Sequence, residues 1–175
     1  NKYALIVPVI NEGKNIINLI NKFYSLCIHE IIDIILIDGG STDNSLIIDN
    51  LKNKEVLGLL IKKGKGKLSS QLRIAYAISL TMGYQGVITI DGNNKDQPDA
   101  IKDFIDLLEK GYDFVQGSRF VKNGIHVNTP FSRYLAIRFI HAPLLSIASK
   151  FNWTDTTQGF RGYSRRLIES DKICL

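Results

Sequence analysis

Residues 3–13, YALIVPVINEG, and residues 31–43, IIDIILIDGGSTD, share one organisation: an apolar run rich in β-branched residues that ends in a polar, glycine-containing turn. Runs of this length and composition predict buried parallel strands at 3–10 and 31–37. Residues 14–27 between them repeat apolar side chains at helical spacing. The stretch therefore predicts a strand–helix–strand unit with both strands running the same way.

The same alternation continues along the chain. Further strands are expected at 56–61, 86–90 and 112–116, and helices at 43–52, 68–82 and 98–110, with another helix starting at Arg165. The side chains expected on the buried face of the helix at 68–82 are Leu72, Ala75, Tyr76 and Ser79. This order predicts an α/β sandwich of Rossmann-like type with a mostly parallel central sheet.

Composition excludes several classes of protein. Of the 175 residues, 45% are apolar and 22% charged, which suits a globular domain and not a disordered tail, a collagen or a coiled coil. The net charge of +5 favours anionic partners such as phosphorylated small molecules or an acidic membrane surface, and we expect no nucleic-acid partner. Cys27 and Cys174 lie far apart without metal-type spacing, which favours a reducing compartment. We expect one domain over residues 1–175, trimmed at its carboxyl end.

Polar side chains follow the predicted strands, at the edge of the sheet where such folds bind ligands. The first loop lacks the G-x-G-x-x-G pattern of dinucleotide-binding domains and carries Glu12, which either accepts from ribose hydroxyls or serves only as a first-turn carboxylate. Asp38 ends the second strand and is able to accept from a base or a ribose. Lys65 lies in a loop of four lysines and two glycines, which either binds phosphate or is solvated surface.

Residues 90–99, IDGNNKDQPD, are open to two interpretations. Asp91 and Asn93 stand two apart at a strand end, where their oxygens are able to share a hard divalent cation with a diphosphate. The same residues also suit a polar turn before a helix that starts at Pro98.

Residues 130–151 are apolar but carry Arg133 and Arg138. A spanning helix is not expected, because each central arginine costs about 2.5–3.5 kcal/mol on insertion scales. The segment suits either an amphipathic helix at a membrane surface or a core helix kinked at Pro143.

Six motifs in this order resemble glycosyltransferase family 2, which has the GT-A fold. They are IVPVINEG, IILIDGGSTDNS, the GKG loop, ITIDGNNKDQPD, VQGSRF and TDTTQGFRGYSR, and together they span nearly the whole chain. The last two are most similar to the branch that contains dolichol-phosphate mannose synthase and bacterial polyprenyl-phosphate glycosyltransferases.

The resemblance implies a site for a nucleotide-diphosphate sugar. Its residues would be Pro8, Val9, Asn11, Glu12, Asp38, Lys65, Asp91 and Gly92. Asp91 and Asn93 occupy the D-x-D position that holds a divalent metal, Mg²⁺ or Mn²⁺. Asn93 replaces a carboxylate and Lys95 stands where the branch often has glutamine, so weaker metal use is expected, and Lys95 is able to pair with the diphosphate directly.

The resemblance also implies a site for the acceptor. Arg119, Arg133, Arg138 and Arg161 match phosphate-binding positions, Arg161 serving either the donor or the acceptor. Asp155 would orient a cation or act as a base, and the catalytic residues would be Asp91, Arg119 and Asp155.

These residues predict an inverting transfer of sugar from the nucleotide to a polyprenyl phosphate. The enzyme would be cytoplasmic and peripheral, at the inner face of the membrane. One alternative is transfer to a saccharide hydroxyl in surface-polysaccharide synthesis, with Asp155 as the base. Another is a nucleotide-sugar-binding domain with little turnover, which the departures at Asn93 and Lys95 favour.

Overall fold

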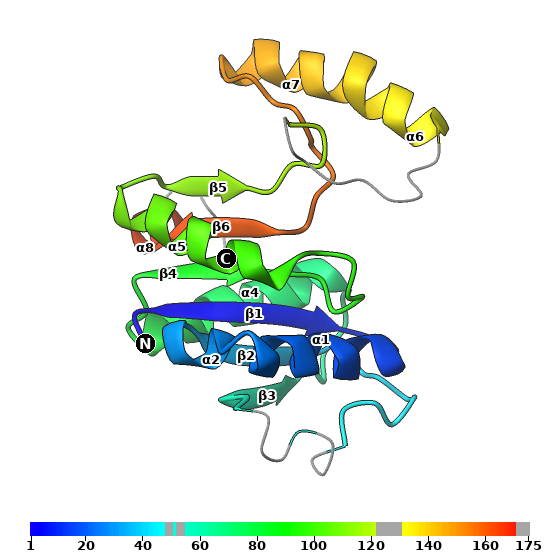
Figure 1. Ribbon diagram of the computed structural model, residues 1–175, viewed down its shortest axis with the longest axis vertical. Coiled ribbons are helices and arrows are strands. Elements are labelled where there is room, and N and C mark those ends of the chain that lie inside the picture. The colour runs from blue at the N-terminus through cyan, green and yellow to red at the C-terminus, as the bar shows by residue number, and fades with distance from the viewer. Residues whose placement is uncertain (48–50, 52–54, 122–130, 171–175) are drawn as a thin grey trace. The chain divides into compact units, whose positions relative to one another are not determined.

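The computed structural model describes residues 1–47, 51, 55–121 and 131–170. By its internal contacts the chain divides into two compact units: residues 1–115 with 160–175, and residues 116–159. The first unit is built on a six-stranded sheet of order β3-β2-β1-β4-β6-β5 (Figure 1).

The expected strands are all present. Their bounds are β1 Tyr3–Val9, β2 Asp33–Asp38, β3 Gly58–Ile61, β4 Gly86–Thr89 and β5 Phe114–Gln116. β1 pairs in parallel with both β2 and β4, and β2 with β3, so the mostly parallel sheet is confirmed. β2 begins later than expected, because Ile28–Ile31 form a short helix, α2.

A sixth strand was not expected. β6, Arg161–Ser164, pairs antiparallel with β4, with Thr89 opposite Arg161 and Ile88 opposite Gly162. A Cβ on Gly162 would come within 3.2 Å of the Phe104 ring, so only glycine fits there without displacement. Polar residues and a glycine replace the apolar run that marks a buried strand, which explains the missed prediction.

The helices of the first unit follow the predicted spacing closely. They are α1 Lys14–Ser25, α4 Leu68–Thr81, α5 Ile101–Glu109 after a 3₁₀ turn at Pro98–Ala100, and α8 Arg165–Ile168. The helix expected at 43–52 is different: residues 43–46 form bends and turns, and residues 48–50 and 52 lie outside the described part.

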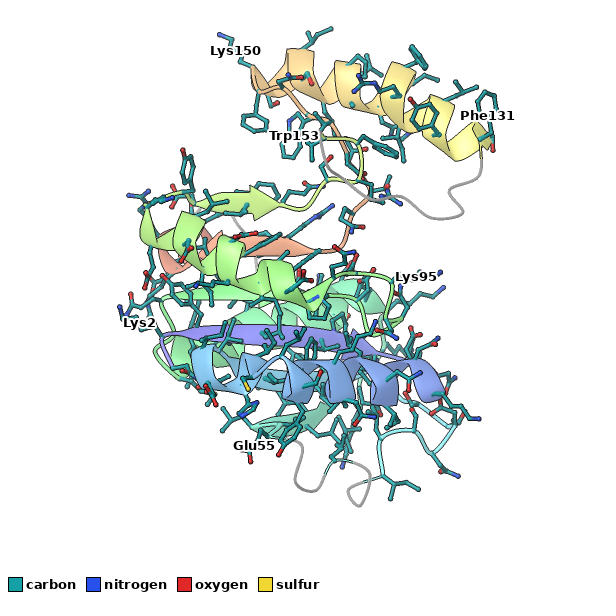
Figure 2. The ribbon with its side chains drawn as sticks, viewed as in Figure 1. Lys2, Glu55, Lys95, Phe131, Lys150 and Trp153 are labelled. Atoms are coloured by element: carbon teal, nitrogen blue, oxygen red, sulfur yellow. The ribbon has the colours of Figure 1, made fainter. Side chains whose placement is uncertain are left out.

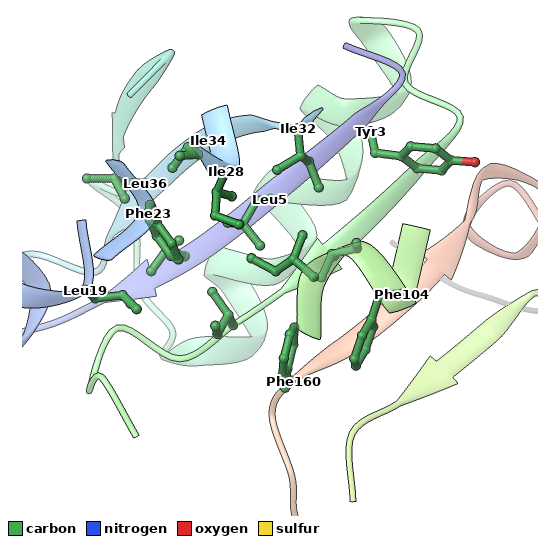
Figure 3. Packing of buried hydrophobic residues seen from close by; sticks show 14 of the residues in the cluster. Tyr3, Leu5, Leu19, Phe23, Ile28, Ile32, Ile34, Leu36, Phe104 and Phe160 are labelled. Atoms are coloured by element: carbon green, nitrogen blue, oxygen red, sulfur yellow. The ribbon is translucent and has the colours of Figure 1, made fainter. Parts of the chain in front are cut away.

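Side chains of β1 alternate between two apolar cores. Leu5 and Val7 belong to the core that α1 and α5 complete with Phe23 and Phe104 (Figure 3). Ala4 and Ile6 belong to the core on the other face, together with Ala75 of α4. β1 is fully covered on both sides, as expected for a central parallel strand.

The second unit contains a helical stretch over residues 131–149. It consists of α6 Phe131–Leu135, a π-helical turn at Ala136–His141 and α7 Ala142–Ser149. Pro143 has no N–H to donate to a carbonyl of the preceding turn, and the wider π turn lies just before it. Within the described residues, no helix is long and apolar enough to cross a membrane.

Candidate active site

Hydrogen bonds join the loops that follow β1 and β2. The Asn11 carbonyl Oδ1 accepts from the Thr42 backbone N–H at 2.7 Å, and the Asn11 N–H donates to Ser41 Oγ at 3.0 Å. Asn11 has a φ of 52°, a left-handed conformation that asparagine tolerates better than most residues. The Gly13 N–H donates to Asp43 Oδ2 at 2.7 Å. The two predicted nucleoside-contacting loops therefore form one structure.

Asp38 is buried at the end of β2 and supports its own loop. Its Oδ1 accepts from the backbone N–H groups of Gly40 and Ser41, at 3.1 and 2.8 Å, and from Ser41 Oγ at 2.6 Å. Its Oδ2 receives no hydrogen bond within the part of the chain that the structure describes. One oxygen thus shapes the loop, and the other remains available to a ligand.

Gln71 of α4 is a structural residue that the sequence interpretation missed. Its side chain is 3% exposed, and Nε2 donates to the carbonyls of Val9 at 3.0 Å and Ile37 at 2.7 Å. A Cβ on Gly39 would come within 3.1 Å of this amide, so the glycine permits the close approach. One signal in the sequence could have identified it: Gln71 is four residues before Ala75, so the two lie on the same face of the helix, and Ala75 belongs to the face expected to be buried.

The loop after β4 packs against the loop after β1. A Cβ on Gly92 would come within 3.1 Å of the Pro8 carbonyl, 3.4 Å of Val9 Cγ2 and 3.5 Å of Glu12 Cγ. Gly92 therefore places the neighbouring Asp91 beside the predicted nucleoside loop. Lys65, by contrast, is exposed on the lysine loop.

Asp91 lies at this edge of the sheet in a mainly buried position. Burial raises the pKa of its carboxyl, although the positive charges of Arg161 and Lys95 oppose that rise. A desolvated carboxylate in this position is stabilised by any further cation that approaches it. Arg161 stands opposite Thr89 in the β4–β6 ladder, so the structure puts this predicted phosphate-binding residue in the same unit as Asp91.

Asn93, the second predicted metal ligand, already accepts a hydrogen bond within its own loop. Asn93 Oδ1 accepts from the Lys95 backbone N–H at 3.0 Å, which closes a polar turn. Its remaining lone pair and the Asp91 carboxylate are hard oxygen donors of the type that Mg²⁺ and Mn²⁺ prefer. Across the described residues no group of three His, Cys, Asp or Glu side chains is placed to hold a metal. The two donors fit a metal only if ligand oxygens or water supply the rest.

In the second unit, Arg119 and Asp155 form a buried ion pair. Arg119 Nε and Nη2 donate to Asp155 Oδ2 and Oδ1 at 2.8 and 3.1 Å, and Nη2 also donates to Thr157 Oγ1 at 2.6 Å. The Asp155 side chain is fully buried, while that of Arg119 is 21% exposed. The fork geometry fixes the guanidinium in one orientation.

Asp155 is ionised in this arrangement. Burial by itself would raise the pKa of its carboxyl, but the hydrogen bonds from Arg119 and from the Thr157 N–H outweigh that effect and lower the pKa. A carboxylate with a lowered pKa and a bidentate partner is a poor proton acceptor. The geometry therefore favours Asp155 as a residue that orients Arg119 and not as a general base. Arg138 is exposed on the helical stretch, and the Arg133 side chain lies outside the described part.

A family model described as glycosyl transferase family 2 matches residues 4–171. The chain belongs to glycosyl transferase family 2. Solved structures with this fold include the glucosyl-3-phosphoglycerate synthase of Mycobacterium tuberculosis in complex with Mn²⁺ and uridine diphosphate. It matches with a TM-score of 0.66 and 18% identity, over 94% of this chain and 57% of that one. The GT-A fold expected from the sequence is thereby confirmed.

Curated relatives of this family 2 chain are transferases named for polyprenyl lipids. The polyprenol monophosphomannose synthase of Mycolicibacterium smegmatis is 23% identical over 171 residues, which cover 94% of this chain and 62% of the relative. The undecaprenyl-phosphate 4-deoxy-4-formamido-L-arabinose transferase of Yersinia pestis (strain Pestoides F) is 27% identical over 179 residues, which cover 99% and 52%. The chain thus spans between about half and three fifths of the length of these relatives.

Proposed function

We propose that this family 2 chain transfers a sugar from a nucleotide-diphosphate sugar to a polyprenyl phosphate. The observation that carries the donor half is the packing of Gly92 on Pro8 and Val9, which brings the neighbouring residue Asp91 beside the first loop predicted to hold the nucleoside. The names of the relatives support the acceptor half.

On the donor side, Asn11, Glu12 and Asp38 would receive hydrogen bonds from the nucleoside. Asp91 and Asn93 would hold a divalent cation, which when bound neutralises the charge on the departing diphosphate. Mn²⁺ accompanies uridine diphosphate in the structural relative, which supports this class of metal.

On the acceptor side, Arg119 would bind the lipid phosphate, and Asp155 would hold its guanidinium in the required orientation. A phosphate is already an anion near neutral pH, so its attack on the sugar needs no strong general base. This agrees with the lowered pKa of Asp155, which suits it poorly to activating a saccharide hydroxyl.

The helical stretch would lie on the membrane surface, which is one of the two arrangements predicted for residues 130–151. Pro130 lies outside the described part of the chain. Its large apolar side chains are highly exposed: Phe131 by 73%, Phe139 by 68%, Leu144 by 62% and Ile147 by 78%. No aspartate or glutamate occurs between residues 131 and 151, so its charge is entirely positive. Exposed apolar and cationic side chains on one helix suit an interface with anionic lipid.

The acceptor is tested by offering polyprenyl phosphate and a free oligosaccharide side by side, with radiolabelled nucleotide sugars and Mn²⁺. Label is expected in the lipid fraction, because the lipid phosphate needs no base. Label in the oligosaccharide alone would assign a saccharide acceptor instead. Nucleotide binding without transfer to either acceptor would favour a binding domain with no turnover.

Replacing both Arg133 and Arg138 by alanine is expected to weaken binding to anionic liposomes. The loss should be about 1 kcal/mol for each cation near the surface, while nucleotide affinity stays at the parent value. Co-sedimentation at two salt concentrations measures it, since added salt should reduce the difference between variant and parent. The matched control removes two exposed cations of the first unit, Lys22 and Lys102. Loss of nucleotide binding with unchanged liposome affinity would show that these arginines serve the donor site and not the membrane.

A further inference from the structure

The loop after β4 carries less negative charge than a D-x-D pair. Asn93 is neutral, and its Oδ1 already accepts from the Lys95 N–H at 3.0 Å. Asp91 is the single carboxylate between residues 91 and 95. Two carboxylates in this place would repel a diphosphate until a metal neutralised them, whereas one carboxylate repels it far less.

Two cations surround that single carboxylate. Lys95 is exposed at the end of the sheet toward which β1 points (Figure 2). Within the described residues its ammonium group makes neither a hydrogen bond nor an ion pair. Arg161 lies on the neighbouring strand, β6, where it pairs with Thr89 of β4. Thr89 is two residues before Asp91 in the sequence. The charges of both cations reach the Asp91 carboxyl.

Asp96 adds a second carboxylate directly after Lys95, so the charges of residues 91–96 and Arg161 sum to zero, whereas an aspartate in place of Asn93 would make the sum negative. The charges of Lys95 and Arg161 both act on the Asp91 carboxylate, and an ammonium and a guanidinium each form strong, charge-assisted hydrogen bonds with phosphate oxygens. A lysine acts as a compact charge that is able to follow a flexible diphosphate, while a guanidinium held on a strand offers fixed donors.

We propose that Lys95 and Arg161 form a cationic clamp on the donor diphosphate, which lets the donor bind without a divalent metal. The clamp rests on the proposed function, since it requires that the chain binds a nucleotide-diphosphate sugar at this loop. In this arrangement Lys95 itself binds the diphosphate, and a divalent metal only adds to the positive charges of Lys95 and Arg161.

The test is isothermal titration of UDP, GDP and dTDP into the parent and into Lys95→Gln, each with Mn²⁺ and with EDTA. The parent is expected to bind one of these nucleotides in EDTA with a Kd within about tenfold of that in Mn²⁺. Lys95→Gln should weaken binding in EDTA by about 10- to 100-fold, the range for one hydrogen bond to a charged group. In Mn²⁺ the same variant should lose much less.

Two further variants sharpen the result. The double variant Asn93→Asp/Lys95→Gln provides two carboxylates and no lysine, and is expected to bind nucleotide only when Mn²⁺ is present. Lys102→Gln removes an exposed lysine of α5 and should match the parent throughout. Because Lys95 is exposed, thermal unfolding of Lys95→Gln should also match the parent, so a loss of affinity is not a loss of fold.

The outcomes separate the clamp from the donor site. Parent binding that disappears in EDTA, or a Lys95→Gln variant that behaves like Lys102→Gln, overturns the clamp and leaves the proposed function standing. A parent that binds none of the three nucleotides in either condition removes the proposed donor site, and the clamp falls with it.

Discussion

Asp91→Asn is expected to reduce the rate of sugar transfer by about 100-fold or more, the usual loss when one group that stabilises a developing charge is removed. Asp91 directly precedes Gly92, which packs on Pro8 and Val9, and the burial of its carboxylate makes it a strong site for a cation. The substitution keeps the shape of the side chain but removes the charge. Initial rates with saturating donor and acceptor measure the effect.

The control for this variant is Asp99→Asn, which removes an exposed carboxylate at the start of the helix that follows the same loop. It should transfer sugar at the parent rate. Both variants should unfold at the parent temperature, because neither side chain belongs to the apolar cores. An Asp91→Asn variant within threefold of the parent rate would show that the D-x-D assignment is wrong.

Asp155→Ala is expected to destabilise the second unit by about 3 kcal/mol, the lower end of the range for breaking a buried ion pair. The lower end applies because Arg119 is 21% exposed and is able to regain some solvation. Trp153, the single tryptophan, lies in this unit, so urea unfolding followed by its fluorescence reports the change locally (Figure 2).

The pH dependence of this stabilisation has a definite sign. The pKa of Asp155 is lowered in the folded chain, so the ion pair stabilises fully above the unfolded value of about 3.9. The stabilisation is lost as pH falls through the lowered folded pKa. Asp155→Ala should lack this part of the acid dependence.

The exposed pair Lys2–Glu109 provides the comparison for the loss of stability, because Glu109→Ala should cost no more than about 1 kcal/mol. Equal losses in the two variants would contradict a structural role for Asp155.

The sequence predicts the strands that are buried on both faces, because their apolar runs leave little choice of structure. β1 and β2 are found within two residues of their expected limits, and the chain order specifies their parallel pairing. β6 has no apolar run, and its pairing with β4 depends on the shape of Gly162 against Phe104. Such a contact joins residues far apart in sequence and leaves no local periodicity.

Glu12, Asp38 and Asp91 were proposed from the ends of strands, since topology alone gathers those positions at one edge. The sequence does not show which hydrogen bonds each side-chain oxygen accepts. The Oδ1 atoms of Asp38 and Asn93 are both occupied by backbone N–H groups of their own turns. Gln71 was missed for a related reason: a polar residue on a helix predicts solvent exposure unless its acceptors are known.

The late position of β6 in the chain affects how the protein is made. β4 ends at Thr89, but its antiparallel neighbour begins only at Arg161, after the whole second unit. At translation rates of about 5–20 residues per second, ribosomes need roughly 2–9 s to add the 44 residues 116–159. Throughout that interval β4 has one edge without its final partner, and an unpaired edge is a template for pairing with other chains. The nascent chain therefore passes through a period of aggregation risk at β4, an edge that β6 covers in the finished sheet.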